Sequence, residues 1–384
     1  MTAAVAVPSR ENEIADAIAD ATRDGATLSI VGGGSKARFG APTEARALAM
    51  SGFAGIVDYD PAELVLTLRP GTPLAEVQAL VAGQGQMLAF EPFDHGPIYG
   101  ESEARATIGG VVAAGVAGSQ RVAVGGARDH LLGFRAVSGR GETFVAGAKV
   151  VKNVTGYDLP KLAAGSWGRL FAMTELTLKV LPRPRVAATR FIEGLDDAGA
   201  VRAMAAAMGS QAEVAAAAHI PADLNHGRAM TAFRIQGFPS SVVARCAMLE
   251  TVLGGRINTP DDEQAAAIWS DLRTLAPLDG ARALWRVNVP PSAVCAVIAA
   301  VRPLGAQWLL DWAGGLAWIG IDGEAGAVRQ AALAAGGHAT LLRGNDADRA
   351  AIPAFHPPAP GLAALEARVR RAFDPAGVFE TGRF

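Results

Sequence analysis

The sequence predicts an α+β protein that is built from two domains. Its 384 residues exceed the length of one typical domain, which is about 100–200 residues. Half of the residues are hydrophobic and 19% are charged, a balance that can bury a sizeable core. Strand patterns and helix patterns alternate irregularly along the chain, which favours an α+β architecture over a regular βαβ relay.

The first half of the chain opens with a predicted helix for which Ser9 is a candidate N-cap. The apolar residues that follow recur at helical spacing, at Ile14, Ala17, Ile18 and Ala21. Turn residues then separate predicted strands and one more predicted helix, with the strands at 27–31, 64–68, 134–137, 142–145 and 174–180 and the helix at 74–82.

The run Leu-Pro-Arg-Pro-Arg at residues 181–185 interrupts this pattern and is the best candidate domain boundary. Beyond it, helix patterns fall at 198–208, 241–253, 265–275, 325–335 and 361–373, and strand patterns fall at 230–236, 284–289, 308–311 and 316–321. This alternation is typical of an open sheet covered by helices, as in a smaller cap domain.

Composition excludes several classes of protein. A net charge of −2 without a basic run argues against a nucleic-acid partner. Only Cys246 and Cys295 occur, too few for a disulfide framework or for an iron–sulfur cluster held by this chain alone. Neither a secretory signal nor a membrane span is recognisable, so we expect a soluble cytoplasmic protein. Association with a membrane through a partner stays open.

Glycine is enriched, with 45 residues in the chain, and one cluster follows the predicted strand 27–31 at once. This cluster consists of Gly32, Gly33, Gly34, Ser35 and Lys36. Successive N–H groups freed of side chains can form an anion-binding nest, and the lysine adds a positive charge, so a pyrophosphate is the natural ligand. The spacing matches neither a Walker A loop nor a GxGxxG motif. Taken alone, such a turn is more often only structural.

Two further segments are dense in small or polar residues. Residues 106–118 contain Thr107, Gly109 and Gly110, and allow another molecule or another backbone to approach closely. Residues 147–168 mix glycine turns with polar groups and an aromatic residue, more densely than a plain core needs. A tightly packed turn and a surface loop remain the structural alternatives for these two segments.

Together, these segments resemble the FAD-binding domain of the vanillyl-alcohol oxidase/PCMH superfamily, and more closely the FAD-binding (E) subunits of bacterial glycolate oxidases. The resemblance is carried, in order, by GGGSK at 32–36, ATIGG at 106–110, ARDHLLGFRAVSGRGE at 127–142, VVKNVTGYDLPKLAAGSWG at 150–168 and MTELTLKVLPRP at 173–184. It implies a PCMH-type domain of two subdomains at 1–184, a smaller α+β cap at 185–352, and a C-terminal segment at 353–384 that packs back on the first domain.

The resemblance also implies which residues hold FAD. The loop from Gly32 to Lys36 would wrap the pyrophosphate, and Thr107, Gly109 and Gly110 would line the path of the phosphates and the ribityl chain. Other residues would lie along the cofactor or, for the last one, near its adenosine end: Asn153, Gly156, Tyr157, Asp158 and Thr174. Arg128 and Asp129 either lie near the flavin or form only a structural turn. Because the loop has no His or Cys, we expect non-covalent FAD, with His95 and His130 as the remaining candidates for a covalent bond.

The family reaction oxidises a small 2-hydroxy acid, such as glycolate, to the 2-oxo acid. Catalytic members carry a His-Gly-Glu-Gly stretch in the cap, which this sequence lacks. His219 and His226 stand seven apart, as in a metal motif, but Pro221 lies between them, and we favour two ordinary loop histidines over a metal site. Glu380 and Thr381 replace an Asn-Pro pair of the family, and we expect a carboxylate there to repel a substrate carboxylate.

We therefore expect an FAD-binding subunit that routes electrons beside a catalytic flavoprotein paralogue and an iron–sulfur subunit, with its own catalytic residues unknown and no metal. Two alternatives stay open. One is a self-sufficient FAD-dependent 2-hydroxy-acid dehydrogenase, and the other is a non-catalytic assembly subunit whose flavin cradle is empty.

Overall fold

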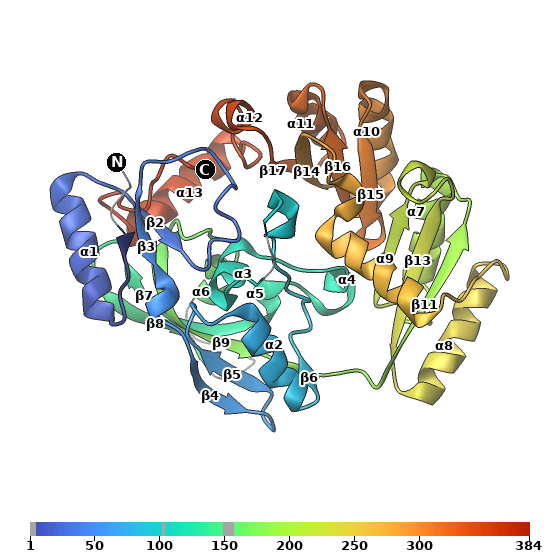
Figure 1. Cartoon of the computed structure of the whole chain (residues 1–384), viewed down its shortest axis with the longest axis horizontal. Coiled ribbons are helices and arrows are strands. Elements are labelled where there is room, and N and C mark those ends of the chain that lie inside the picture. Colours follow the sequence, from blue (N-terminus) through green and yellow to red (C-terminus); the bar gives the residue numbers. More distant parts are fainter. Residues whose placement is uncertain (1–4, 102–103, 149–156) are drawn as a thin grey trace.

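The computed structural model describes residues 5–101, 104–148 and 157–384. The elements form an N-terminal part (residues 5–182), a cap (residues 186–343) and a C-terminal segment (residues 344–384). In Figure 1 the N-terminal part lies on the left and the cap on the right, and both chain termini lie at the N-terminal part. The chain therefore crosses to the cap and returns.

The N-terminal part contains three sheets. One has three parallel strands in the order β1-β3-β2, one has five antiparallel strands in the order β4-β5-β9-β7-β8, and one is the pair β10-β6. The strands are β1 (Val5–Ala6), β2 (Leu28–Val31), β3 (Arg46–Ala49), β4 (Ile56–Asp60), β5 (Val65–Leu68), β6 (Gln86–Met87), β7 (Leu131–Ser138), β8 (Thr143–Gly147), β9 (Phe171–Lys179) and β10 (Leu181–Pro182). The helices are α1 (Glu11–Asp24), α2 (Leu74–Gly83), α3 (Ile108–Ala114), α4 (Arg121–Val124), α5 (Ala127–His130) and α6 (Leu159–Ala163).

The cap is one seven-stranded antiparallel sheet in the order β11-β13-β12-β15-β16-β14-β17. Its strands are β11 (Val186–Glu193), β12 (Ala216–Ile220), β13 (Met230–Gly237), β14 (Ala283–Asn288), β15 (Gln307–Asp311), β16 (Leu316–Ile321) and β17 (His338–Arg343). Its helices are α7 (Asp197–Met208), α8 (Pro239–Val252), α9 (Asp262–Thr274), α10 (Val294–Val301) and α11 (Ala325–Ala334).

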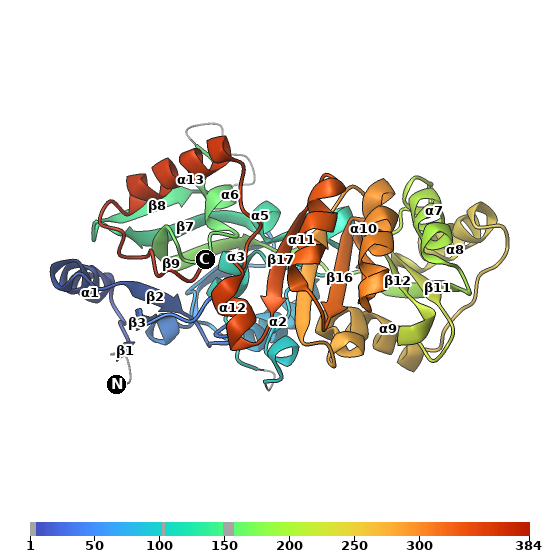
Figure 2. The same cartoon turned by 90° about the horizontal axis from the view of Figure 1, so that it is seen from above.

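Alternate residues of each cap strand pack to opposite sides of the sheet, as the period of a strand requires. On β16, Ala317 and Ile319 pack against the cluster that α7, α8, α10 and α11 cover. Leu316 and Trp318 belong instead to the hydrophobic cluster that forms the core of the N-terminal part. Figure 2 shows those helices along one side of the cap, with α9 on the other side. One face of the cap sheet is therefore turned to the N-terminal part.

Most predicted elements are confirmed to within a few residues. The N-cap is an exception, because α1 begins at Glu11 with Arg10 as its N-cap, so the assignment of Ser9 is wrong. The carboxylate of Glu13 accepts the backbone N–H groups of Ser9 at 2.7 Å and of Arg10 at 3.3 Å, which fixes the start of the helix one residue later. Many elements are not predicted by the sequence patterns, among them β3, β4, β11, β12, β17, α3 and α10.

The C-terminal segment, with α12 (Asp346–Ala351) and α13 (Pro360–Phe373), packs back on the N-terminal part. The backbone N–H of Leu28 on β2 donates to the carbonyl of Val378 at 2.7 Å. Val378 and Phe379 join the buried cluster that contains Ile14 of α1. We keep the domain limits 1–184 and 185–352, followed by a returning segment at 353–384, as a proposal, although the cap sheet itself ends at Arg343.

The buried carboxylate of Asp374 fixes this tail, because it accepts the N–H groups of Val378 at 2.9 Å and Phe379 at 2.7 Å. We expect Asp374→Ala to lower the free energy of unfolding by about 3 kcal/mol, because two buried N–H groups lose a charged acceptor. Urea denaturation of the two chains measures this loss. Asp374→Asn, which keeps one good acceptor, should lose about half as much. Equal stability of all three chains would contradict the assignment.

Candidate functional site

The glycine loop (residues 32–36) leaves β2 directly at the edge of a cavity. None of the amide N–H groups in the glycine loop donates to another residue in the part of the chain that the structure describes. Gly34 has a φ of 84°, in the left-handed region that favours glycine. A run of free N–H groups with such a residue forms a concave anion nest. The glycine loop can therefore bind a negatively charged group.

The other glycines of the loop are required by close packing against residues 105–107. A Cβ atom on Gly33 would lie 1.7 Å from the carbonyl oxygen of Arg105, and one on Gly32 would lie 2.2 Å from Oγ1 of Thr107. Arg105 also donates from Nε to the carbonyl of Gly33 at 3.3 Å. A side chain at Gly33 would force the backbone of Arg105 to move, and one at Gly32 would force the side chain of Thr107 to move.

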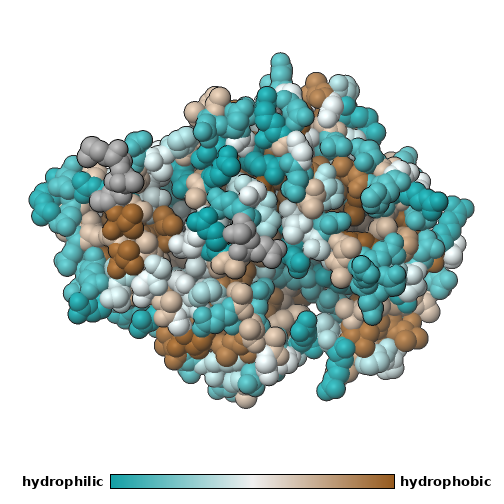
Figure 3. Space-filling view, viewed as in Figure 1, coloured by the Kyte–Doolittle hydropathy of each residue, from teal (hydrophilic) through white to brown (hydrophobic). Residues whose placement is uncertain are grey.

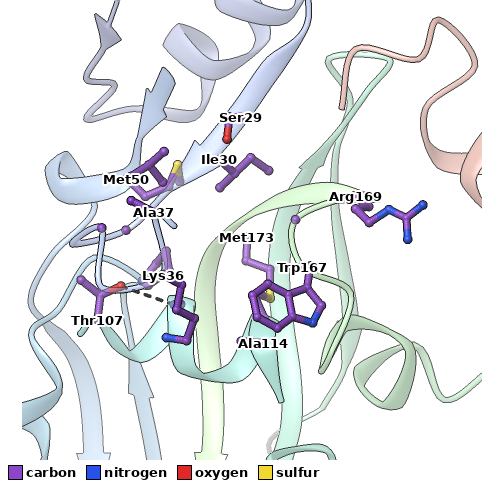
Figure 4. A pocket seen from close by; sticks show the side chains of 18 of the residues that line it. Ser29, Ile30, Lys36, Ala37, Met50, Thr107, Ala114, Trp167, Arg169 and Met173 are labelled. Carbon is purple, nitrogen blue, oxygen red and sulfur yellow. Dashed lines mark hydrogen bonds between the residues drawn. The ribbon is translucent and has the colours of Figure 1, made fainter. Parts of the chain in front are cut away.

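The cavity lies between the glycine loop, α3, β9 and the C-terminal tail. Figure 4 shows Lys36 and Thr107 on one side of it, and Trp167 and Met173 on the other. Three cations line it, Lys36, Arg169 and Arg383, and no Asp or Glu is among the described residues that do so. The rest of the wall is mostly apolar and includes Ile30, Met50, Phe171 and Phe379. Such a cavity suits a ligand that carries both anionic and aromatic groups.

Lys36 supplies the charge that lies nearest the loop amides. Part of its side chain is exposed, but burial lowers the pKa of its ammonium to about 8, and the nearby Asp94 opposes this shift. Nζ lies 3.4 Å from Oγ of Ser35, the one polar partner of this ammonium among the described residues. A bound phosphate would raise this pKa, because an opposite charge favours the protonated amine.

The C-terminal tail completes the wall of the cavity. The sequence analysis did not predict this role of the tail. Arg383 donates from Nε to the carbonyl of Phe39 at 2.6 Å, and also to the carbonyls of Lys36, at 3.0 Å, and Ala37. Phe39 stacks on Trp167 with ring centroids 4.0 Å apart. Arg383 thus binds backbone carbonyls of the glycine loop and of the segment that follows it, and keeps that segment in place. Its only sequence signal is one arginine near the end of the chain, which no local pattern distinguishes.

Comparisons with known proteins agree with this geometry. A family model described as FAD binding domain matches residues 2–147. The chain is 35% identical to the glycolate oxidase subunit GlcE of Escherichia coli (strain K12) over 375 residues, which cover 97% of this chain and 95% of GlcE. The chain belongs to the GlcE family. It is an FAD-linked oxidoreductase subunit with a PCMH-type FAD-binding fold, and FAD is its cofactor.

More distant relatives match about a third of the chain. The glycolate oxidase subunit GlcD of Bacillus subtilis (strain 168) is 30% identical over 134 residues, 35% of this chain and 27% of GlcD. A D-lactate dehydrogenase of Anaerostipes hadrus is 34% identical over 144 residues, 37% of this chain and 28% of that enzyme. The solved structure of an alkyldihydroxyacetonephosphate synthase superposes with a TM-score of 0.68 at 15% identity, covering 97% of this chain and 76% of that one. This last likeness shows the fold.

The structure brings one group of the sequence-predicted residues together. The glycine loop lines the cavity together with Thr107, Gly109 and Gly110 of α3 and its N-cap. Oγ1 of Thr107 accepts the N–H of Gly110 at 3.4 Å, the dashed line of Figure 4. The loop amides and Lys36 fit the pyrophosphate of FAD, and the apolar wall fits an aromatic ring. The roles of these residues stay predictions that this geometry supports.

Other predicted residues lie outside the cavity. Asn153 and Gly156 fall outside the described residues. Tyr157 is 90% exposed, and Asp158 forms an exposed ion pair with Lys161 at 3.0 Å. We keep their contact with FAD as a prediction only.

Arg128, Asp129 and Thr174 also do not line the cavity. Asp129 on α5 accepts the N–H of Gly126 at 2.8 Å, as in a structural turn, and Arg128 is exposed. The hydroxyl of Thr174 on β9 donates to Oε1 of Glu11 at 2.6 Å. That bond joins β9 to α1, so in this structure Thr174 connects two elements.

Three of the six histidines, namely His95, His130 and His219, are buried, and none of the three lines the cavity. His95 stacks on Phe93, with centroids 4.7 Å apart, and Nε2 of His130 contacts the carbonyl of Val124 at 3.0 Å. His219 lies in β12 and not in a loop, which corrects the expectation. Its Nδ1 contacts the hydroxyl of Thr231 at 2.9 Å. Within the described ranges, no group of three or more His, Cys, Asp or Glu residues is placed to hold a metal.

Glu380 does not repel a ligand in the way that the sequence suggests. Arg370 on α13 pairs with its carboxylate at 2.9 Å, from Nε to Oε1, and Glu380 is not among the residues that line the cavity. Thr381, the next residue, does line the cavity, and its carbonyl accepts the hydroxyl of Thr43 at 2.8 Å. The expected repulsion is wrong because the charge is paired and turned away.

Substitution of Gly33 tests the loop. We expect Gly33→Ala to weaken FAD binding at least about tenfold, because the new methyl group displaces the loop amides from the carbonyl of Arg105. Titration of the FAD-free chain, followed by flavin fluorescence, measures the affinity. Gly83→Ala is the matched control, because a Cβ there meets no atom within 4 Å. Unchanged affinity in Gly33→Ala would place the pyrophosphate elsewhere.

The lowered pKa of Lys36 predicts that the affinity for FAD depends on pH. Its ammonium is charged below its pKa of about 8 and attracts the phosphates, so FAD affinity should fall as pH rises through about 8. Lys36→Arg should remove this dependence, because a guanidinium stays charged above pH 12. Lys36→Gln should bind FAD weakly at every pH. Fluorescence titrations between pH 7 and 9.5 measure these affinities, and a flat profile in the unaltered chain would contradict the role of Lys36.

Proposed function

We propose that this chain is the FAD-binding subunit of a glycolate oxidase complex, which oxidises glycolate or a similar small 2-hydroxy acid and relays the electrons. The observation that carries the proposal is the match to GlcE over 97% of the chain, combined with a cation-lined cavity that opens beside unpaired loop amides. Both halves of the chain take part in that match, so the likeness extends to the cap.

FAD supplies the redox chemistry when it is bound, because no amino-acid side chain accepts a hydride in this way. The chain's own residues then hold and orient it. The loop amides and Lys36 bind the phosphates, Thr107 keeps the start of α3 beside them, and Trp167 closes the opposite wall. Arg383 fixes the segment after the loop through its backbone carbonyls. These residues position the cofactor and exclude water from it.

We infer that the partners are a catalytic flavoprotein paralogue and an iron–sulfur subunit. The match to GlcD over 35% of this chain supports a related flavoprotein as a partner. Exposed apolar side chains offer surfaces for assembly: Ile56 and Val57 on β4, and Val243, Met248 and Val252 on α8. Figure 3 shows hydrophobic groups at the lower edge of one face, over the positions of β4 and α8. No helix among the described residues is long and apolar enough to cross a membrane.

The two alternatives differ in what the isolated chain does. A self-sufficient dehydrogenase would oxidise glycolate alone, and an assembly subunit would contain no flavin. The cation-lined cavity argues against the second. For the first, the described residues offer no His, Cys, Asp and Glu cluster that would hold a metal for the hydroxyl group.

Absorbance spectroscopy separates these functions. We expect the purified chain to show the visible bands of bound flavin and to keep them when glycolate is added without oxygen. Addition of the catalytic paralogue and the iron–sulfur subunit should then bleach the bands with glycolate. Bleaching of the isolated chain would favour the self-sufficient enzyme, and a colourless chain that still copurifies with both partners would favour the assembly subunit.

A further inference from the structure

The cavity beside the glycine loop is small for the FAD that we assign to it. Its volume is about 160 Å³. Pockets that enclose drug-sized ligands measure about 300–1,000 Å³. FAD joins a flavin ring system to an adenosine diphosphate and is larger than such a ligand. Part of the cavity wall must therefore move when FAD enters.

One part of the wall is held less firmly than the rest. The glycine loop packs directly on residues 105–107, and α3 and β9 are regular elements. Residues 381–384, which we call the strap, belong to no helix or strand. Three residues of the strap line the cavity, namely Thr381, Arg383 and Phe384. The strap is therefore the part of the wall that moves most easily.

A glycine in the strap can act as a hinge. Just before the strap, Val378 and Phe379 are buried, and the carboxylate of Asp374 accepts their backbone N–H groups. Gly382 has a φ of 70°, and a Cβ atom there would meet no atom within 4 Å beyond its chain neighbours. A glycine without packing around it can change its φ and ψ without a clash. Gly382 therefore separates an anchored segment from Arg383.

Hydrogen bonds to residues 36–43 fasten the strap. Arg383 donates to the carbonyls of residues 36, 37 and 39, which are neutral acceptors. The backbone N–H of Ala41 donates to the carbonyl of Arg383 at 2.9 Å. The hydroxyl of Thr43 donates to the carbonyl of Thr381 at 2.8 Å. All of these bonds join the strap to one segment, so they break together when the strap lifts.

Phe384 lines the cavity as part of an aromatic cluster. Its ring centroid lies 5.7 Å from that of Trp167, 5.6 Å from that of Phe39 and 5.4 Å from that of Phe355. Phe39 and Trp167 stack on each other more closely, at 4.0 Å. Lifting of the strap removes only Phe384 from the cluster and leaves the closer pair in place. The cavity then widens beside Trp167, which is part of its wall.

We propose that the strap is a gate for FAD, which lifts about Gly382 to admit the cofactor and closes again with Arg383 as its latch. The bonds of the latch go to the protein and not to the cofactor, so the same bonds hold the strap before and after FAD binds. The strap therefore controls how fast FAD enters and leaves, more than how tightly it is held. The gate rests on the assignment of this cavity to FAD and goes beyond the reaction with glycolate.

The rates of FAD binding test the gate on the full chain. Stopped-flow mixing of FAD with the FAD-free chain measures the association rate, and trapping of released FAD measures the dissociation rate, both by flavin fluorescence. We expect Arg383→Gln to raise both rates at least about fivefold, because the charge-assisted bonds of the latch are lost. The Kd should change by less than about threefold, because both rates rise together.

A second variant removes a bond of the strap from outside the cavity. Thr43 is not among the residues that line the cavity, and Thr43→Val removes its bond to the strap. Both rates should rise about threefold. Arg245→Gln is the matched control, because Arg245 also donates to backbone carbonyls, those of Ala212 at 3.1 Å and Gln236 at 2.7 Å, but within the cap. Both rates should be unchanged in this control.

Hydrogen exchange at the amide of Ala41 reports opening of the strap without FAD, because this amide donates to the carbonyl of Arg383. Exchange in the FAD-free chain should be faster in Arg383→Gln and in Thr43→Val than in the unaltered chain. Faster dissociation of FAD with an unchanged association rate in both variants would overturn the gate and make the strap a fixed wall. Faster exchange at Ala41 with both rates of FAD unchanged would also overturn it.

The proposed function fails separately. If the reconstituted complex does not oxidise glycolate while both rates of FAD binding follow the strap variants, the gate stands and the function of the complex is wrong. If the complex oxidises glycolate while neither strap variant changes the association rate, the function stands and the gate is wrong.

Discussion

The contact between the glycine loop and the backbone of residues 105–107 constrains the whole cofactor site. A methyl group at Gly33 would lie 1.7 Å from a carbonyl oxygen, so the two segments touch with no side chain between them. This contact turns the loop amides away from the protein and leaves them without acceptors. It also sets the start of α3 beside the loop, because Thr107 caps that helix. Anion binding here is a property of backbone geometry, which Lys36 reinforces.

The cap is joined to the N-terminal part by polar contacts as well as by hydrophobic packing. The hydroxyl of Ser119 donates to the carboxylate of Asp311 at 2.8 Å, and Arg234 pairs with Glu91. Burial raises the pKa of Asp311 to about 6, so its charge is costly in this interface. Buried polar contacts of this kind require one relative placement of their partners, because a shifted cap would leave them unpaired. These contacts therefore favour one position of the cap against the N-terminal part.

Local signals in the sequence point to the glycine loop but not to the interface between the N-terminal part and the cap. The glycine loop follows a strand and contains its own lysine, so residues 32–36 can be proposed as an anion site without knowledge of the fold. The alanine-rich strand β12 carries no strand signal, because alanine favours helices and only burial between β13 and β15 makes this segment extended. The charge of Glu380 misleads because its partner, Arg370, lies on a helix that the sequence does not place beside it. Arg383 contacts residues that lie hundreds of positions earlier in the chain, and no spacing rule connects it to them.

The surrounding charges explain why the buried His95 stays neutral. Lys36 carries positive charge beside the glycine loop, and Arg286 carries it on β14 of the cap. A protonated His95 would add a third positive centre, without solvent to screen it. Its burial, together with both cations, lowers the pKa of His95 and keeps the imidazole uncharged. The neutral ring then adds no further positive charge beside Lys36 and Arg286.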